Sequence, residues 1–247
     1  MNCMPGINST ELNSPASILL DSDNNMYIAD SGNSRVIFWP NGATSGSTIA
    51  GTGTLGNANN QLYTPFGISR DSTSGTLYIA DYGNHRIMRY PYNATHGTMV
   101  AGGNGPGTNS SQFTYPSSVH FDSLSNSLIV VNCLNNNIVR WKLGDNDWTL
   151  ITGSANGSTG STSTLFNFPL TVILDPMGNM YATDVVNHRI QFFLSGEANG
   201  TTIAGVSTIS GGNATLLSAP YGIALDSQLN LYVADTVNHR IQKFLRY

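Results

Sequence analysis

Short runs of apolar residues alternate with polar loops along the whole chain. The runs are rich in Ile, Val, Leu, Tyr and Phe, as in "LYIAD" and "LYVAD", and the segments between them are rich in Gly, Ser, Asn and Thr. β-branched and aromatic residues favour extended strands, whereas the loop residues favour tight turns. No segment shows the three- to four-residue spacing of an amphipathic helix. The pattern therefore predicts an all-β protein.

The runs recur in five similar units with a period of 50 to 53 residues, each opening on a proline: Pro15, Pro65, Pro116, Pro169 and Pro220. In every unit a first run leads from the proline to an Asp, a "MYIAD"-like run and a "RVIFW"-like run follow, and runs such as "STIAG" join the units. Four antiparallel strands in a repeat of this length are typical of a β-propeller blade. We therefore predict that residues 1–247 form a single β-propeller of five blades.

The fifth unit stops after its third run, so it lacks the fourth strand of a blade. The segment "NCMPG" near the start ends in the same Gly as the joining runs. We expect residues around Asn2–Met4 to complete the fifth blade, because this pairing would remove an exposed sheet edge.

One pattern is shared by the units and is clearest in Pro220–Phe244. It reads P-x-G-I-x-x-D followed by Y-[IV]-A-D-x-x-N-H-R-I, and it is weakest in the third unit. The pattern resembles the NHL-repeat family of β-propellers. The resemblance implies the fold and says little about function. Since members of this family commonly have six blades, the alternative that the five units are part of a six-bladed ring stays open.

An Asp and an Arg five residues later recur at the turn between the second and third runs. The third unit has Asn132 and Asn137 in these two places, so both charges are lost together. Joint loss indicates a contacting pair, since an unpaired buried charge is costly. We expect an ion pair in the other four units: Asp30–Arg35, Asp81–Arg86, Asp184–Arg189 and Asp235–Arg240.

Three of these turns read "NHRI", which could indicate a metal or catalytic centre. His85, His188 and His239 belong to different blades, however, and a zinc ion needs ligands at about 2.0–2.1 Å. We interpret them as turn residues. We interpret the Asp that ends each first run as a turn cap. These residues are Asp21, Asp71, Asp122, Asp175 and Asp226. We expect no cofactor, and the alternative is a calcium ion that these carboxylates bind in the channel.

Charge and composition narrow the possible partners. Only 10% of the residues are charged and the net charge is −4, with no basic cluster. Nucleic-acid binding, which depends on clustered Lys and Arg, is not indicated, nor is any apolar stretch long enough for a membrane span. The chain as given has no signal peptide pattern. Its low Lys and Glu content and its Asn-x-Ser/Thr sequons favour a secreted glycoprotein, the sequons being at Asn8, Asn93, Asn109, Asn156, Asn199 and Asn213.

Residues that differ between the units are the candidates for function, because the shared residues build the scaffold. Aromatic residues flank the prolines, and aromatic side chains dominate binding hot spots. We expect them to form a loop-face surface for a protein or glycan partner: Tyr63, Phe66, Tyr115, Phe168 and Tyr221. Arg70 and His120 interrupt the apolar first runs and are candidates for a small anionic ligand in the channel. The alternative is an Arg lying along apolar surface and a hydrogen-bonded core His.

The alternative function is that of a metal-dependent lyase or a lactonase-like enzyme at the channel mouth. In the amidating lyase of this family, zinc-binding His residues follow the proline. Here that place holds Ala16, Phe66, Ser117, Leu170 and Tyr221. No Ser-His-Asp spacing or phosphate-binding loop is present either. The sequence therefore favours a non-enzymatic binding module.

Overall fold

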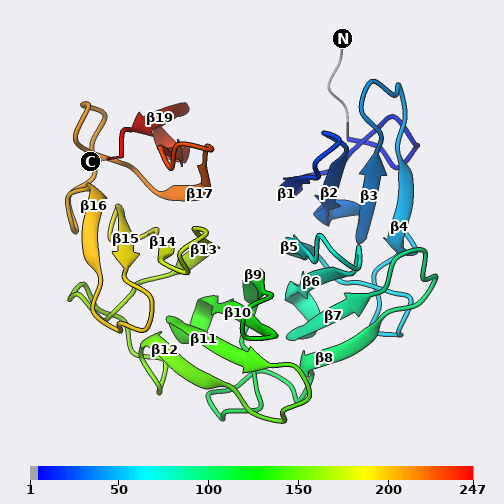
Figure 1. Ribbon diagram of the computed structural model, residues 1–247, viewed down its shortest axis with the longest axis horizontal. Coiled ribbons are helices and arrows are strands. Elements are labelled where there is room, and N and C mark those ends of the chain that lie inside the picture. The colour runs from blue at the N-terminus through cyan, green and yellow to red at the C-terminus, as the bar shows by residue number, and fades with distance from the viewer. Residues whose placement is uncertain (1–4, 247) are drawn as a thin grey trace. The chain divides into compact units, whose positions relative to one another are not determined.

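The structure is a computed structural model that describes residues 5–246. Within this range the chain is built from β-strands and short 3₁₀ turns (Figure 1). The strands are β1 (Pro15–Leu20), β2 (Met26–Asp30), β3 (Arg35–Trp39), β4 (Ser47–Gly51), β5 (Pro65–Arg70), β6 (Leu77–Asp81), β7 (Arg86–Tyr90), β8 (Thr98–Gly102), β9 (Pro116–Asp122), β10 (Ser127–Asn132), β11 (Asn137–Lys142), β12 (Thr149–Gly153), β13 (Pro169–Leu174), β14 (Met180–Asp184), β15 (Arg189–Phe193), β16 (Thr201–Gly205), β17 (Pro220–Leu225), β18 (Leu231–Asp235) and β19 (Arg240–Phe244).

Each sequence repeat forms one antiparallel sheet whose strands lie side by side in chain order. The sheets β1–β4, β5–β8, β9–β12 and β13–β16 have four strands, and β17–β19 has three among the described residues. These sheets are the five blades of a β-propeller fold, as the repeat predicts. Asn2–Met4, which we expected to complete the fifth blade, lie outside the described residues.

The chain divides into two compact units. The first reaches to Leu128 and includes Lys142–Asp147, and the second comprises Ile129–Trp141 and the chain from Trp148 onward. In the first unit, Tyr27 and Val36 of the first blade pack against Ile79 of the second. In the second unit, the fourth and fifth blades pack in the same way.

A large apolar residue three positions before the blade proline is buried at the blade junctions. Leu62 belongs to the core of the first unit, and Phe166 and Leu217 belong to cores of the second. All three are almost completely inaccessible to solvent. Burial of such a side chain contributes about 1.5–3 kcal/mol, so this position stabilises each junction independently of the sheets.

Each blade except the third contains a buried Asp–Arg ion pair. The Arg Nε to Asp Oδ2 distances are 2.7, 2.7, 2.8 and 2.8 Å, for Arg35–Asp30, Arg86–Asp81, Arg189–Asp184 and Arg240–Asp235. Every one of these Asp side chains is fully buried, and only Arg240 is substantially exposed. The pair therefore lies across the turn between the second and third strands, where the sequence places it.

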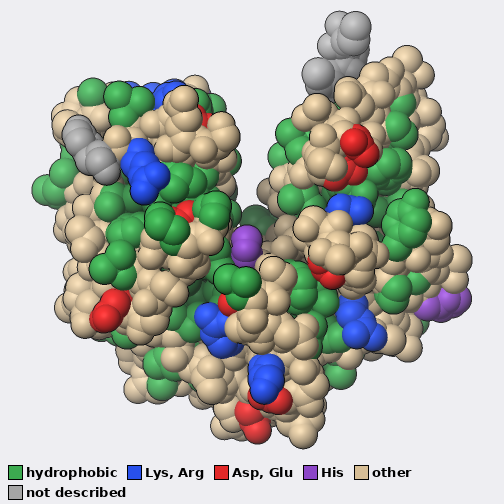
Figure 2. All heavy atoms as spheres, viewed as in Figure 1, with side chains coloured by type: hydrophobic (Ala, Val, Ile, Leu, Met, Phe, Trp, Pro, Cys, Tyr) green, Lys and Arg blue, Asp and Glu red, His purple; other side chains and the backbone are tan. Residues whose placement is uncertain are grey.

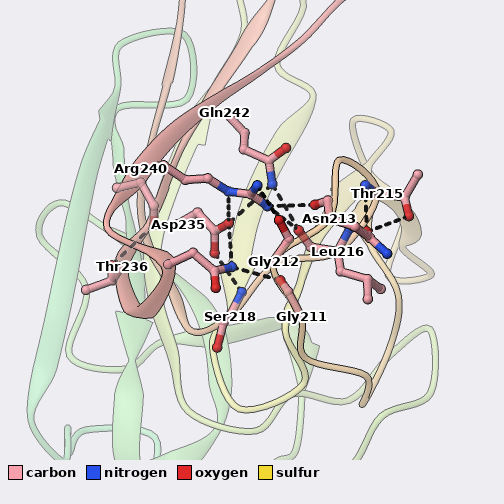
Figure 3. Close-up of polar contacts among 12 residues, drawn as sticks. Gly211, Gly212, Asn213, Thr215, Leu216, Ser218, Asp235, Thr236, Arg240 and Gln242 are labelled. Carbon is pink, nitrogen blue, oxygen red and sulfur yellow. Dashed lines mark hydrogen bonds and ion pairs between the residues drawn. The ribbon is translucent and has the colours of Figure 1, made fainter.

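The carboxylate and the guanidinium also bind the loop that precedes the blade. In the second blade, Asp81 accepts hydrogen bonds from the Tyr63 N–H and from Asn84 Nδ2. The remaining donors of Arg86 reach the carbonyls of Asn57, Ala58 and Gln61. The same arrangement surrounds Asp235 and Arg240 in the fifth blade (Figure 3). We call this set the Asp–Arg–Asn network.

The network exists at a desolvation cost. Burial raises the pKa of Asp81 above its ordinary value, although hydrogen bonds from the Tyr63 N–H, Asn84 and Arg86 act to lower it. Burial raises the pKa of Asp184 in the same way. Charged groups that are removed from water need complete pairing. This explains why the third blade can lack both charges: with neither the Asp nor the Arg present, no buried charge is left unpaired.

We expect Asp81→Asn and Arg86→Asn each to lower the free energy of unfolding by about 3–5 kcal/mol, because each leaves one buried charge unpaired. The double variant reproduces the Asn pair of the third blade and should cost less than the sum of the single changes. Urea denaturation of the four proteins measures this coupling. Additive costs would contradict the pairing, and Arg240→Asn serves as a milder comparison because Arg240 is more exposed.

Candidate functional site

The "NHRI" histidines connect consecutive blades. His85 and His188 have positive φ values of 56° and 54°, as a left-handed turn residue has. The His85 Nδ1 accepts the N–H of Tyr115 at 3.1 Å, and the His188 Nδ1 accepts the N–H of Ala219 at 3.2 Å. Tyr115 and Ala219 directly precede the proline of the next blade. Because both Nδ1 atoms accept a hydrogen bond, the imidazoles are neutral with the proton on Nε2.

The third blade makes the same connection without a histidine. Asn136 takes the left-handed position with φ of 52°, and its Oδ1 accepts the N–H of Phe168 at 2.9 Å. An acceptor atom, supplied by either an imidazole or an amide, thus makes this connection from three blades. Among residues 5–246, no group of three or more His, Cys, Asp or Glu side chains is arranged to hold a metal ion.

Three aromatic residues form a contiguous surface in the first unit, and a fourth, Tyr63, packs on the turn that carries one of them. The ring centroids of Phe66 and Tyr82 are 5.6 Å apart, and those of Tyr82 and Tyr115 are 4.8 Å apart. Tyr63 lies across the same turn, since a Cβ at Gly83 would meet its ring carbons at 2.6 Å. Aromatic pairs at these distances attract each other beyond simple burial. We call Tyr63, Phe66, Tyr82 and Tyr115 the aromatic cluster.

The backbone holds the aromatic cluster at two points. The N–H of Tyr63 donates to the buried carboxylate of Asp81, and the N–H of Tyr115 donates to His85, whose ring also lies 4.5 Å from that of Tyr115. Tyr63 is exposed, and the other three rings are half-buried. A ligand would therefore meet rings that are already ordered.

The other two aromatic candidates belong to the second unit. Phe168 packs at the edge of an apolar cluster with Cys133, Leu170 and Val185. Tyr221 is exposed, and its carbonyl accepts a hydrogen bond from Thr171 Oγ1. Of the five residues that we expected on the binding surface, the structure thus places Tyr63, Phe66 and Tyr115 in one cluster.

Tyr82 was not among our candidates, although it lies between Phe66 and Tyr115. It directly follows Asp81 of its turn. The equivalent residues in the other repeats are Ser31, Cys133, Val185 and Thr236. An aromatic residue at this place occurs in the second repeat alone. This difference from the other repeats is the sequence feature that could have identified Tyr82 as a candidate binding residue.

Arg70 stacks on an aromatic ring at a cavity between the first two blades. Its guanidinium lies 5.4 Å from the centre of the Tyr27 ring, a cation–π arrangement. The cavity has a volume of about 670 Å³, and its lining includes Asp21, Asp23, Tyr92 and Arg70. Phe121 stacks on Tyr78 at the next junction, so Arg70 takes the place of an aromatic partner at this one.

His120 lies in β9 and is half-buried. Burial lowers the pKa of His120, and the nearby Asp122 acts in the opposite direction. Burial thus disfavours the charged imidazolium of His120, which suits a core histidine better than a fixed positive charge for an anionic ligand.

The Asp at the end of each first strand closes its own turn. In each blade its Oδ1 accepts the N–H two residues later, as in Asp21 with Asp23 and Asp226 with Gln228. The side chain of Asn230 donates to Asp226 Oδ2 at 2.8 Å and lowers the pKa of Asp226 to about 2. These carboxylates act as turn caps, and a channel calcium ion stays the alternative to our expectation of no cofactor.

The surface carries few charges. Figure 2 shows Lys, Arg, Asp and Glu side chains scattered between wide areas of uncharged atoms. The six sequon asparagines, Asn8, Asn93, Asn109, Asn156, Asn199 and Asn213, are all exposed. No helix in the described part of the chain is long and apolar enough to cross a membrane.

Comparison with known proteins identifies the repeat. Residues 217–244 match the NHL repeat family, so the fifth repeat is an NHL repeat and the predicted resemblance is confirmed. No curated protein sequence matches the chain significantly.

Solved structures share the fold at low sequence identity. An auxiliary nutrient binding protein from Bacteroides thetaiotaomicron is 17% identical with a TM-score of 0.71, over 96% of this chain and 60% of that one. A chain of a nidogen/laminin complex is 13% identical with a TM-score of 0.66, over 95% of this chain and 81% of that one. A streptogramin B lyase is 12% identical with a TM-score of 0.56, over 94% of this chain and 69% of that one. The chain thus spans about 60% of the length of the first of these structures.

The role of His85 predicts a pH effect. Burial lowers the pKa of His85, so below the unfolded value of about 6.5 the unfolded chain binds a proton that the folded chain resists. The stability contributed by His85 is therefore present above about pH 6.5 and decreases as the pH falls.

We expect His85→Asn to keep the acceptor, as Asn136 does, and to reduce this loss of stability in acid. His85→Ala should cost about 1 kcal/mol at neutral pH by removing the acceptor. Urea denaturation of the parent and both variants at several pH values checks this. An unchanged pH dependence in His85→Asn would contradict the assignment.

The turn caps give a second prediction. Because the pKa of Asp226 is depressed to about 2 from 3.8, its contribution to stability is present above the unfolded pKa and is lost as the pH falls through about 2. NMR titration of the carboxyl group should show Asn230→Ala moving this pKa upward. Asn25→Ala, which affects Asp21 in the same way, is the matched control and should leave Asp226 unchanged.

Proposed function

We propose that this NHL-repeat propeller is a non-enzymatic binding module and that its aromatic cluster is the docking surface for a protein or glycan partner. The observation that carries the proposal is the contiguous aromatic cluster on an ordered loop face. Rigid aromatic side chains give a large contact area at little cost in conformational entropy. They need no opposite charge on the partner, which agrees with the sparse charge of the surface.

The cluster suits two kinds of group. The face of a Tyr or Phe ring can pack on the apolar face of a sugar, and it can also receive an apolar anchor residue of a protein. The phenol hydroxyls of Tyr63, Tyr82 and Tyr115 offer hydrogen bonds to a polar rim in either case.

The relatives in fold support a binding function without identifying the partner. Two of the structures named above are described as a nutrient binding protein and as a protein–protein complex. Likeness to a lyase rests on the fold alone, and His85 and His188 serve as acceptors between blades. We therefore place the enzymatic alternative second.

We also propose that the protein works outside the cytoplasm as a glycoprotein. All six sequons lie on exposed asparagines, and the Bacteroides relatives in fold are described as nutrient-binding proteins. Few lysines and a net charge of −4 fit this proposal as well.

Substitution of the aromatic cluster tests the proposed function. We expect Phe66→Ala and Tyr82→Ala to weaken binding by about 30-fold or more, the effect of losing a hot-spot residue of about 2 kcal/mol. Binding is measured on an array of neutral glycans and on immobilised extracellular matrix proteins. Tyr92→Ala removes an exposed Tyr outside the cluster and should leave binding unchanged.

Equal binding by the parent, the cluster variants and Tyr92→Ala would refute the docking surface. Circular dichroism spectra confirm that each variant is folded. A response on glycans alone or on proteins alone identifies which class of partner the cluster accepts.

A further inference from the structure

The cavity beside Arg70 lies between the first and second blades, and all of its described lining residues belong to the first compact unit. Its volume of about 670 Å³ falls within the range of about 300–1,000 Å³ that is typical of small-molecule sites. None of the four residues of the aromatic cluster lines it, and neither does His120. The cavity is therefore separate from the proposed docking surface.

Arg70 is the lining residue that the repeat does not explain. Its equivalents in the other four blades are all apolar: Leu20, Phe121, Leu174 and Leu225. Arg70 is half-buried, and its Nε is inaccessible to solvent and has no hydrogen-bond partner within residues 5–246. A buried donor without a partner is costly. An acceptor group from outside the chain would therefore stabilise this side chain.

Two carboxylates line the same cavity. Asp21 and Asp23 belong to the turn that joins β1 and β2. The side chain of Asn25 holds the pKa of Asp21 below its ordinary value, and the positive charge of Arg70 acts in the same direction. Within the described chain, however, neither carboxylate forms an ion pair with Arg70. The cavity thus holds positive and negative charges that are near each other but not paired.

The two carboxylates differ in what they already bind. Asp21 accepts hydrogen bonds from the N–H groups of Asp23 and Asn25 and from the side chain of Asn25. Its capacity is therefore used in closing its own turn. Asp23 is exposed, so it is the carboxylate that is open to a cationic group of a ligand.

Apolar and aromatic side chains form another part of the lining. Phe38, Ile49 and Leu77 line the cavity together with the buried rings of Tyr27 and Tyr90. The rings of Phe38 and Tyr27 pack against each other, with centroids 5.1 Å apart. This wall suits an apolar group, because burial of apolar surface is favourable without any directional contact.

An exposed aromatic ring borders the cavity beside Arg70. A Cβ at Gly75 would lie 3.3 Å both from Arg70 Nη2 and from Tyr92 Cβ, so these two side chains are neighbours. Tyr92 is 68% exposed, and its equivalent in the first blade is Asn41. The second blade therefore differs from the first at both residues that flank Gly75.

We infer that this cavity binds a free α-amino acid with a large apolar side chain. The α-carboxylate binds the guanidinium of Arg70 through charge-assisted hydrogen bonds, and the α-ammonium group binds Asp23. The side chain of the ligand packs against Phe38, Ile49 and Leu77.

A zwitterion fits these charges better than other small ligands do. A simple anion would meet two carboxylates, and a simple cation would meet Arg70. A neutral sugar would neutralise neither charge and would place hydroxyl groups against the apolar wall, where they lack partners. The inference is independent of the proposed function, since the aromatic cluster lies outside the cavity.

Isothermal titration calorimetry with matched ligands tests the inference, using protein made in bacteria so that Asn93 at the cavity carries no glycan. L-phenylalanine should bind the parent protein. Phenethylamine lacks the carboxylate and phenylpropionate lacks the ammonium group, so each should bind about tenfold more weakly or worse, the effect of losing a charged hydrogen bond. Glycine lacks the apolar side chain and should give no detectable binding.

Two variants assign the charged partners. Arg70→Leu restores the apolar residue of the other blades, so it should fold as stably as the parent and lose the binding of L-phenylalanine. Asp23→Asn should weaken the binding of L-phenylalanine about tenfold without weakening that of phenylpropionate.

Two further variants are controls that should bind L-phenylalanine as the parent does. Arg89→Leu removes a half-buried arginine of the same blade that does not line the cavity. Phe66→Ala alters the aromatic cluster alone, so failure of the proposed docking surface and failure of this site are told apart.

A parent protein that binds none of these ligands, or that binds maltose in their place, would overturn the inference. Equal binding of L-phenylalanine and either analogue would overturn the assignment of a zwitterionic ligand, and full binding by Arg70→Leu would overturn the role of Arg70. Circular dichroism spectra and thermal melting of each variant separate loss of the site from loss of folding.

Discussion

The buried Asp at the end of the second strand is the interaction on which the rest of the molecule depends. Loops between blades are long and rich in Gly, Ser and Asn, and most of their described residues lie outside the sheets. Buried N–H and C=O groups must nevertheless be paired. The Asp–Arg–Asn network supplies the partners, since Asp81 takes one loop N–H and Arg86 takes three loop carbonyls. One carboxylate thereby orders an entire irregular segment.

The candidate binding surface relies on the same network. Tyr63 is held through Asp81 and Tyr115 through His85, so two members of the aromatic cluster have their backbones fixed by polar residues at recurring positions of the repeat. Different positions of the repeat thus serve the scaffold and the candidate binding surface. Repeated polar residues order the loops, and the side chains that vary between repeats decide what the ordered loops present.

The construction is one junction used again and again, as in other repeat proteins in which each unit contacts its neighbours. Within each compact unit, one blade buries the first strand of the next. Ile68 packs with Tyr27 and Val36 of the blade before it, and Val172 packs with Ile138.

The sequence alone determined the elements and the fold. Strands, turns and the repeat depend on local periodicity, and the joint loss of charge at Asn132 and Asn137 revealed the ion pair because its partners are five residues apart. Tertiary structure alone decided the rest. The acceptor role of His85 involves a donor 30 residues away, and the position of Tyr82 between Phe66 and Tyr115 depends on how one blade packs on the next. Such contacts depend on how the faces of neighbouring blades pack together, and this packing leaves no periodic pattern in a single sequence.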